Sequence, residues 1–141
     1  MKEARTVVLD NEAVQALVDV AHRKHRRVLA AVEVTAARNL RRAGSVRLVV
    51  PAAVRVEAGW DRSAGRSAAV NRLRVDDSPL DGRAADAAAE VVSALGVSVA
   101  DAHLASVLLT APAPHAVLTS DKADVRRIAA RIGAAVNVVV V

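Results

Sequence analysis

Short apolar runs alternate with longer segments of helical periodicity along the chain. Five runs are dominated by Val, Leu and Ala, which is typical of strands that are buried on both faces. They lie at residues 7–9, 46–50, around Val75, 116–119 and 135–141. Because strands alternate with helices, the pattern predicts an α/β fold with a central, mostly parallel sheet flanked by helices.

The segments between these runs carry apolar residues every three or four positions, as amphipathic helices do. The expected helices cover residues 12–20, 22–44, 52–60, 68–74, 82–95, 99–111 and 121–132. Gly44, Gly96 and Gly133 stand where three of them end, because glycine readily takes the left-handed conformation found at helix ends. Asp81 can cap the start of the helix at 82–95.

Four acidic residues follow the predicted strands or open the helices next to them. Asp10 and Asp121 come at the ends of two strands, Glu57 lies in the helix after the second strand, and Asp101 lies in the first turn of the helix before the 116–119 strand. Ligands of open parallel sheets bind outside the carboxyl ends of the strands. If these units share one edge of the sheet, the four acids converge.

Converged carboxylates repel one another, by roughly 4 kcal/mol for a pair about 4 Å apart at an effective dielectric constant near 20. A cation has to offset that repulsion, or some of the acids have to stay protonated. The chain has no Cys and no clustered His. A purely oxygen-based ligand set favours Mg²⁺ or Mn²⁺ over zinc.

Each acid also has an ordinary structural interpretation. Asp10 and Asp121 can cap helices, and Ser98 with Asp101 has the spacing of a variant capping box. Asp124 stands three residues after Asp121, and we favour a capping arrangement for this pair over an additional metal ligand. Glu57 can be a solvated helix residue, although the apolar surroundings of Glu57 and Asp101 favour a site, since charges are seldom buried without a reason.

Composition adds a basic surface to this picture. The chain has 141 residues, a length typical of one domain, with a net charge of +5 and a pI of about 10.9. Much of the basic charge falls in the 22–44 segment, which can contact RNA phosphates, bind an acidic partner or form a solvated helix face. Aromatic residues make up 1% of the chain, so base stacking is not expected to dominate RNA binding.

The remaining polar groups suggest no further site. The four histidines form no zinc pattern, and we expect them at the surface or in local hydrogen bonds. Trp60 is expected to pack beneath the helix that carries Glu57. No apolar run is long enough to span a bilayer and the start lacks a signal-peptide pattern, so no membrane contact and a cytoplasmic location are expected.

Four stretches, taken in order, resemble the PIN-domain nucleases, and more narrowly the VapC-like ribonuclease toxins of bacterial toxin–antitoxin systems. The stretches are "VVLDNEAVQALV", "LVVPAAVRVEAGW", "VSVADAHLASVLL" and "VLTSDKADVRRIAA". The resemblance implies that residues 1–141 form one PIN-like nuclease domain with Mg²⁺- or Mn²⁺-dependent endoribonuclease activity on RNA. It places the catalytic, metal-binding acids at Asp10, Glu57, Asp101 and Asp121.

The same resemblance implies supporting residues and partners. Asn11, Thr119 and Ser120 would orient the acids and water, with Asn11 standing where the family often has Ser or Thr. A cognate antitoxin protein would block the site, and the toxin would be a homodimer. Two alternatives remain: a catalytically weak PIN-fold module that binds RNA or protein, and a phosphoacceptor signalling domain, for which the chain lacks a well-placed lysine.

Overall fold

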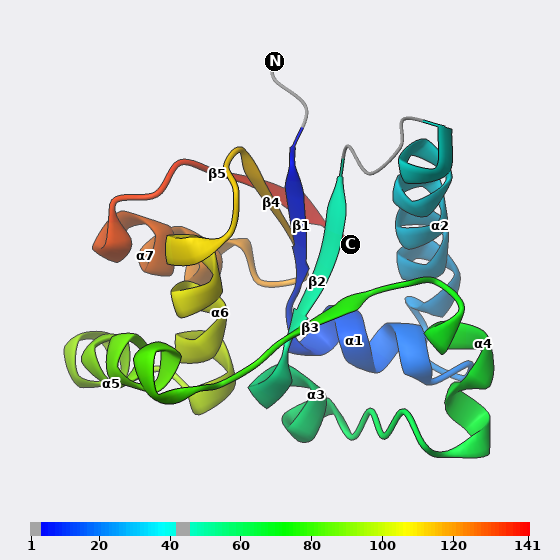
Figure 1. Ribbon diagram of the computed structural model, residues 1–141, viewed down its shortest axis with the longest axis horizontal. Helices are drawn as coiled ribbons and strands as arrows, with labels where there is room; N and C mark the ends of the chain where they lie inside the picture. Colours follow the sequence, from blue (N-terminus) through cyan, green and yellow to red (C-terminus); the bar gives the residue numbers. More distant parts are fainter. Residues whose placement is uncertain (1–3, 42–45) are drawn as a thin grey trace.

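A five-stranded sheet runs through the middle of the protein (Figure 1). The computed structural model describes residues 4–41 and 46–141. The strands are β1 Thr6–Leu9, β2 Arg47–Pro51, β3 Asp76–Ser78, β4 His115–Thr119 and β5 Val136–Val140. They lie in the order β3-β2-β1-β4-β5, and every neighbouring pair is parallel. The predicted α/β fold with a central parallel sheet is therefore confirmed.

Helices cover both faces of the sheet (Figure 1). They are α1 Asn11–Val18, α2 His25–Arg41, α3 Ala52–Ala58, α4 Ala68–Asn71, α5 Gly82–Leu95, α6 Val99–Thr110 and α7 Lys122–Ile132, with a 3₁₀ turn at Gly65–Ser67. Successive strand residues point to opposite faces. Val7 and Leu9 of β1 therefore pack with α1 and α2, whereas Val8 packs with α6 and α7. None of the described helices is both long and apolar enough to cross a bilayer.

Most predicted boundaries agree with the structure, and the clearest difference is at the start of α2. The pattern predicted a helix from residue 22, but α2 begins at His25. Before it, the Asp19 carboxylate accepts a hydrogen bond from the Ala21 N–H (3.0 Å) and the His22 ring accepts one from the Lys24 N–H (3.1 Å). These side-chain bonds hold residues 19–24 in turns. The predicted stop at Gly44 lies outside the described residues.

Two helix ends and one strand follow the sequence closely. Gly96 and Gly133 follow the last residues of α5 and α7 with φ of +67° and +69°, the left-handed conformation that made glycine the expected residue. The short strand expected around Val75 is β3, which begins one residue later, while Val75 itself is buried.

Two of the four histidines are buried. His115 makes a local hydrogen bond, which was one of the two expected positions, whereas His103 is bonded to residues distant along the chain, which was not expected. His103 of α6 is fully buried: its Nδ1 accepts a hydrogen bond from the Ala53 N–H (3.2 Å), and its Nε2 lies 3.2 Å from the Pro79 carbonyl. His115 is buried beside the Ala111 carbonyl, 2.7 Å from its Nε2. Both rings serve as hydrogen-bonded core residues.

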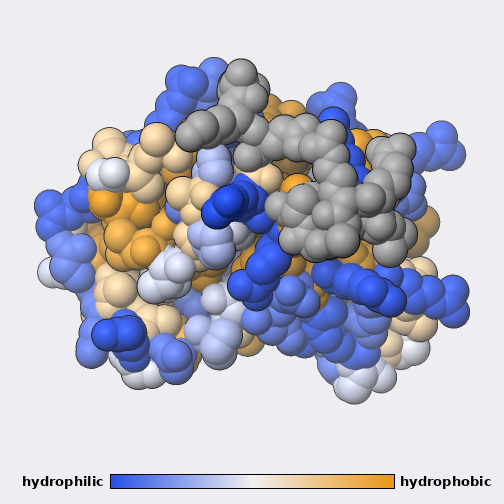
Figure 2. Space-filling model, turned by 45° about the horizontal axis from the view of Figure 1, so that its top comes forward, coloured by the Kyte–Doolittle hydropathy of each residue, from blue (hydrophilic) through white to orange (hydrophobic). Residues whose placement is uncertain are grey.

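Apolar side chains also reach the surface. On the face shown in Figure 2, apolar patches lie among hydrophilic residues. The most exposed large apolar side chains of the described residues are Val56 (82%), Val20 (80%) and Val99 (61%). Contiguous apolar surface is the kind of surface that binds protein partners.

Candidate active site

An acidic pocket lies where the strand order reverses. Chain order runs from β1 toward β2 and β3 on one side and continues with β4 and β5 on the other, so the switch point lies between β1 and β4. Ligands of open α/β sheets bind in the crevice outside the strand ends at this point. A pocket of about 160 Å³ opens there. Its polar lining residues are Asp10, Asn11, Glu12, Asp101, Thr119, Ser120, Asp121 and Asp124.

Asp10 is the most buried of these acids. It follows β1, its side chain is 9% exposed, and it caps α1 by accepting a hydrogen bond from the Ala13 N–H at 2.9 Å. The pKa of Asp10 is raised from its ordinary 3.8 to about 6. Burial is the largest cause, the hydrogen bonds from Thr119 and the Ala13 N–H oppose it, and the nearby charges of Asp101 and Glu12 contribute to the rise. The capping interpretation is confirmed, and the capping residue also lies in the pocket.

Asp101 reaches the same pocket from α6. Burial raises its pKa above the ordinary value, followed by the negative charges of Asp124 and Glu57. The Asp101 N–H donates to the Ser98 hydroxyl at 3.1 Å, so the helix start also has its predicted cap. Asp124, Glu57 and Asp121 therefore lie near enough to Asp101 for their charges to raise its pKa.

Asp121 and Asp124 enter the pocket from the end of β4. The Asp121 carboxylate accepts a hydrogen bond from the Asp124 N–H at 3.1 Å, which confirms the capping arrangement. The Thr119 hydroxyl in turn accepts one from the Asp121 N–H at 2.9 Å and fixes the backbone before the helix. Asp124 pairs with Arg127 at 3.3 Å. Both acids line the pocket as well as stabilising the start of α7.

Glu57 lies beside the pocket rather than in it. It is exposed on α3 and lines a neighbouring apolar groove with Val56, Leu80 and Val99. The Asn11 amide donates a hydrogen bond to the Glu57 carboxylate at 3.4 Å and links it to the start of α1. The structure thus brings Asp10, Asp101 and Asp121 into one pocket and places Glu57 at its margin.

The helix that carries Glu57 ends against a buried aromatic ring. Trp60 is 3% exposed and belongs to the main core, as predicted. The guanidinium carbon of Arg62 lies 4.2 Å from the centre of its ring, and that of Arg55 lies 5.6 Å from it. Arginines at such distances are attracted to the ring face.

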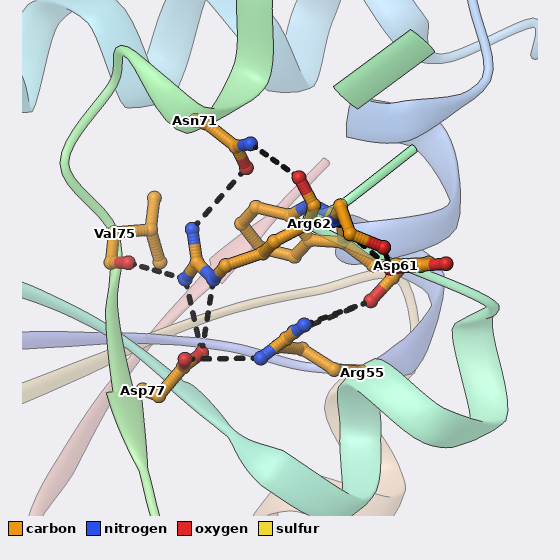
Figure 3. Close-up of polar contacts among 8 residues, drawn as sticks. Arg55, Asp61, Arg62, Asn71, Val75 and Asp77 are labelled. Carbon is orange, nitrogen blue, oxygen red and sulfur yellow. Dashed lines mark hydrogen bonds and ion pairs between the residues drawn. The ribbon is translucent and has the colours of Figure 1, made fainter. Parts of the chain in front are cut away.

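Both arginines also bind the edge strand β3. The Asp77 carboxylate accepts hydrogen bonds from Arg55 (2.9 Å) and Arg62 (3.0 Å), and Arg62 donates to the Val75 carbonyl at 2.6 Å (Figure 3). We refer to Arg55, Trp60, Arg62 and Asp77 as the α3 clasp. It ties the end of α3, and with it the backbone that carries Glu57, to β3.

Glu12 is a site residue that the sequence did not reveal. It lies in the first turn of α1, accepts a hydrogen bond from the Ser120 hydroxyl, and pairs with Lys24 at 3.2 Å. The Ser120 hydrogen bond and the contact with Lys24 lower its pKa against a smaller effect of burial. Acids are common in first helical turns, so its position two residues after Asp10 carried no distinctive signal.

The donor set suits a hard divalent cation. The pocket offers carboxylate, hydroxyl and amide oxygens, the ligands that Mg²⁺ and Mn²⁺ take. The raised pKa values of Asp10 and Asp101 come first from burial, and the negative charges of neighbouring acids add to the rise. Within residues 4–41 and 46–141, however, no three acids or histidines stand close enough to form a ready coordination group. The oxygen ligands of the pocket are of the kind that bind such a metal, but its acids are not close enough together to coordinate one ion as they stand.

No protein-family model matches the chain, and no curated protein matches it either. What the pocket does has to be inferred from its own residues and their geometry.

Proposed function

We propose that the protein is a metal-dependent endoribonuclease and the toxin of a toxin–antitoxin pair that acts in the cytoplasm. The observation that carries the proposal is the pocket at the strand switch point, where Asp10, Asp101 and Asp121 meet from three separate segments. The resemblance of the surrounding stretches to PIN-domain, VapC-like nucleases supports the same function.

In this proposal Asp10, Asp101 and Asp121 hold Mg²⁺ or Mn²⁺ with Glu57 at the margin. A bound divalent ion supplies positive charge against a phosphodiester and lowers the pKa of water. The chain's own supporting groups orient the acids. Asn11 bonds Glu57, and Thr119 fixes the backbone at Asp121.

Ser120 serves the same pocket through a different acid. Its hydroxyl binds Glu12, so it positions a carboxylate that lies beside Asp10 along the chain. Asn11 and Ser120 therefore bind carboxylates, and Thr119 binds the backbone N–H of an acidic residue. Such contacts are what an orienting role requires.

Two protein contacts belong to the proposal. The apolar groove lined by Val56, Leu80 and Val99 supports a homodimer, because an exposed apolar surface of this kind is stabilised by a partner. A second groove of about 300 Å³ lies between α2 and the sheet, lined by Ala31, Arg38 and Val139 among others. Its apolar lining and the charge of Arg38 suit an antitoxin segment with apolar and acidic side chains.

The alternative is a PIN-fold module that binds RNA or protein with little catalysis. It is favoured by one observation, that the acids of the described chain are not drawn into a ready coordination group. The two functions differ in whether purified protein cleaves RNA in a divalent metal.

The test is cleavage of RNA by purified protein in Mg²⁺ or Mn²⁺. We expect products with 5′-phosphate and 3′-hydroxyl ends, because attack by water expels the 3′ oxygen. Asp10→Asn should abolish cleavage while keeping the helix cap, since Asn caps as well as Asp. Asp86→Asn, an exposed acid on α5, is the matched control and should cleave normally.

Full activity in excess EDTA, or products with 2′,3′-cyclic phosphates, would exclude the metal mechanism. For the toxin role, expression of the chain alone should slow bacterial growth, and co-expression of the adjacent reading frame should restore it. A chain that is harmless and is bound by no neighbouring gene product would remove the support for that role.

A further inference from the structure

A lysine stands at the rim of the acidic pocket. Lys24 Nζ lies 3.2 Å from Glu12 Oε1, and the Lys24 side chain is 18% exposed. The other oxygen of Glu12 accepts a hydrogen bond from Ser120, and both Glu12 and Ser120 line the pocket. We propose that Lys24 binds a backbone phosphate of single-stranded RNA at the entrance to the pocket, an inference that rests on the proposed nuclease function and names how its substrate is held.

The backbone around Lys24 is fixed on both sides. Its N–H donates to the His22 ring at 3.1 Å, and its carbonyl accepts from the Val28 N–H at 3.0 Å in the first turn of α2. The His25 ring lies 2.8 Å from the Ala16 carbonyl and joins the start of α2 to α1. The backbone at Lys24 is therefore fixed, and the ion pair with Glu12 holds the ammonium group beside the pocket, so that little ordering is needed when a ligand binds.

The ion pair leaves Lys24 able to bind a ligand. An ammonium group has three donors, and the contact with Glu12 uses one of them. A phosphodiester that approaches Asp10, Asp101 and Asp121 meets like charge, and a fixed cation on the rim lowers that repulsion. The pocket's other ion pair, Asp124 with Arg127, has a more exposed cation, with 54% of the Arg127 side chain accessible.

Basic charge continues from Lys24 along the surface. Arg23, Arg26 and Arg27 are exposed, and none of them forms an ion pair with an acid in the described part of the chain. A strand whose phosphate sits on Lys24 can place neighbouring phosphates on these residues. An acidic peptide could use the same arginines, but its carboxylates gain nothing from approaching the acids of the pocket, whereas a substrate phosphodiester has to approach them.

The experiment measures binding of a labelled single-stranded RNA oligonucleotide in EDTA, over roughly 50 mM to 300 mM salt. Lys24→Gln should weaken binding roughly three- to tenfold. It should also reduce the slope of log Kobs against log salt by about 0.7, the value for one phosphate contact with a single strand. Lys24→Arg should restore both. Lys122→Gln removes the same charge from an exposed lysine that has no ion pair among the described residues, and should change binding less than twofold.

Cleavage kinetics separate this inference from the proposed function. With Mg²⁺, Lys24→Gln should raise KM with little change in kcat, because the contact positions the strand without touching the reacting atoms. If the wild type does not cleave RNA but its binding depends on Lys24, the proposed nuclease function is rejected and the Lys24 contact is supported. If the wild type cleaves RNA and Lys24→Gln leaves the salt slope unchanged, the Lys24 contact is rejected and the proposed nuclease function is supported.

Three further outcomes bear on the inference. Equal losses in Lys24→Gln and Lys122→Gln would mean that only net charge matters, and would overturn it. Displacement of the RNA by polyglutamate as readily as by unlabelled RNA would assign the rim to an acidic protein and would also overturn it. A melting temperature of Lys24→Gln equal to that of Lys24→Arg, with binding lost only in the former, supports it by excluding a folding defect.

Discussion

The effect of removing the charge of Asp101 on stability distinguishes a metal-site residue from an acid that only supports the start of a helix. We predict that Asp101→Asn raises the stability of the metal-free protein by about 1 kcal/mol, because it removes a partly buried charge that faces other acids. The raised pKa of Asp101, caused first by burial and then by Asp124 and Glu57, gives the sign. Thermal melts in EDTA measure the effect, and cleavage should be lost in the same variant.

The opposite sign is expected if Asp101 only supports the start of α6. The substitution would then cost a few tenths of a kcal/mol, through the lost interaction with the helix dipole. Asp86→Asn, on the exposed face of α5, is the control for removing a carboxylate from a helix. A lower melting point for Asp101→Asn in EDTA, with no stabilisation of the wild type by Mg²⁺, would argue against Asp101 as a ligand.

His103 is a residue whose contribution to folding should depend on pH. Burial lowers the pKa of His103 below its ordinary 6.5, and the Pro79 hydrogen bond and Asp81 oppose this in part. As pH falls below 6.5 the unfolded chain takes up a proton that the folded chain does not, so the stabilisation is present above 6.5 and is lost as pH falls. His103→Leu should cost about 2–4 kcal/mol near neutral pH, because the Ala53 N–H and the Pro79 carbonyl lose their partner.

Urea unfolding of wild type and His103→Leu at about pH 8 and about pH 5.5 checks this prediction. The difference in unfolding free energy between the two proteins should shrink at the lower pH. Other titrating groups, Asp10 among them, are common to both proteins and cancel in the difference. A difference in unfolding free energy that stays constant or grows on acidification would contradict a neutral His103 ring with two hydrogen bonds.

At this scale the sequence revealed residues with a local signature. Asp10 and Asp121 could be singled out because each stands at a junction of strand and helix, and Asp101 because it lies in the first turn of the helix before a strand. Glu12 could not, since its partners Ser120 and Lys24 come from distant segments or from a turn that looked helical. The burial of His103 likewise depends on Ala53 and Pro79, which only the folded chain brings to it.

At the scale of elements, the stability of α3 comes from the α3 clasp, because the helix is too short to be stable alone. It has seven residues, and its N-cap residue Pro51 makes no side-chain capping bond. Helices this short are unstable alone and need tertiary contacts. The α3 clasp supplies them: Arg55 and Arg62 lie against the Trp60 ring, and both donate hydrogen bonds to Asp77 (Figure 3).

We predict that Arg62→Gln lowers the unfolding free energy by about 2 kcal/mol, because it leaves the Val75 carbonyl without this donor and removes the ring contact. Arg72→Gln, an exposed arginine in the same connection that has no ion pair among the described residues, should change it by less than about 0.5 kcal/mol. Urea denaturation of both variants measures the two changes. Equal effects would mean that the clasp does not stabilise α3.

Element boundaries were predictable where backbone conformation decides them and not where side chains compete. Gly96 and Gly133 marked helix ends because few other residues take a left-handed conformation easily. Residues 19–24 have the composition of a helix, but Asp19 and His22 bond nearby backbone N–H groups and divert the chain into turns.

At the scale of the whole molecule, the sequence predicted a parallel sheet but not the order of its strands. Alternating strands and helices favour parallel pairing, yet they allow several orders of the strands. The pairing of β1 with β4 joins Thr6 to His115, and no local pattern encodes a contact so distant along the chain. That pairing creates the switch point and the pocket, so the convergence of the acids was conditional on it.

Metal binding and pH should act together on the stability of the entire protein through Asp10. Its pKa is 3.8 ordinarily and about 6 in the folded chain, mainly because of burial. A carboxyl with a raised folded pKa stabilises the fold while it is protonated. Its contribution is therefore fully present below 3.8 and is lost as pH rises through about 6. A divalent cation binds only the ionised form, so it has to compete with the proton below that value.

We therefore predict that Mg²⁺ raises the melting temperature of the wild type more at about pH 8 than at about pH 5, because the proton occupies Asp10 at the lower pH. Asp10→Asn should remove most of the Mg²⁺ effect at both values while melting higher than wild type in EDTA at the higher pH, since the buried charge is gone and the helix cap remains. Asp86→Asn should respond to Mg²⁺ as the wild type does. Calorimetric or fluorescence melts across the series, with Mg²⁺ replaced by an equal ionic strength of Na⁺ in the reference, isolate the specific effect. A Mg²⁺ stabilisation that is independent of pH, or that survives in Asp10→Asn, would place the cation elsewhere than in the pocket at the switch point.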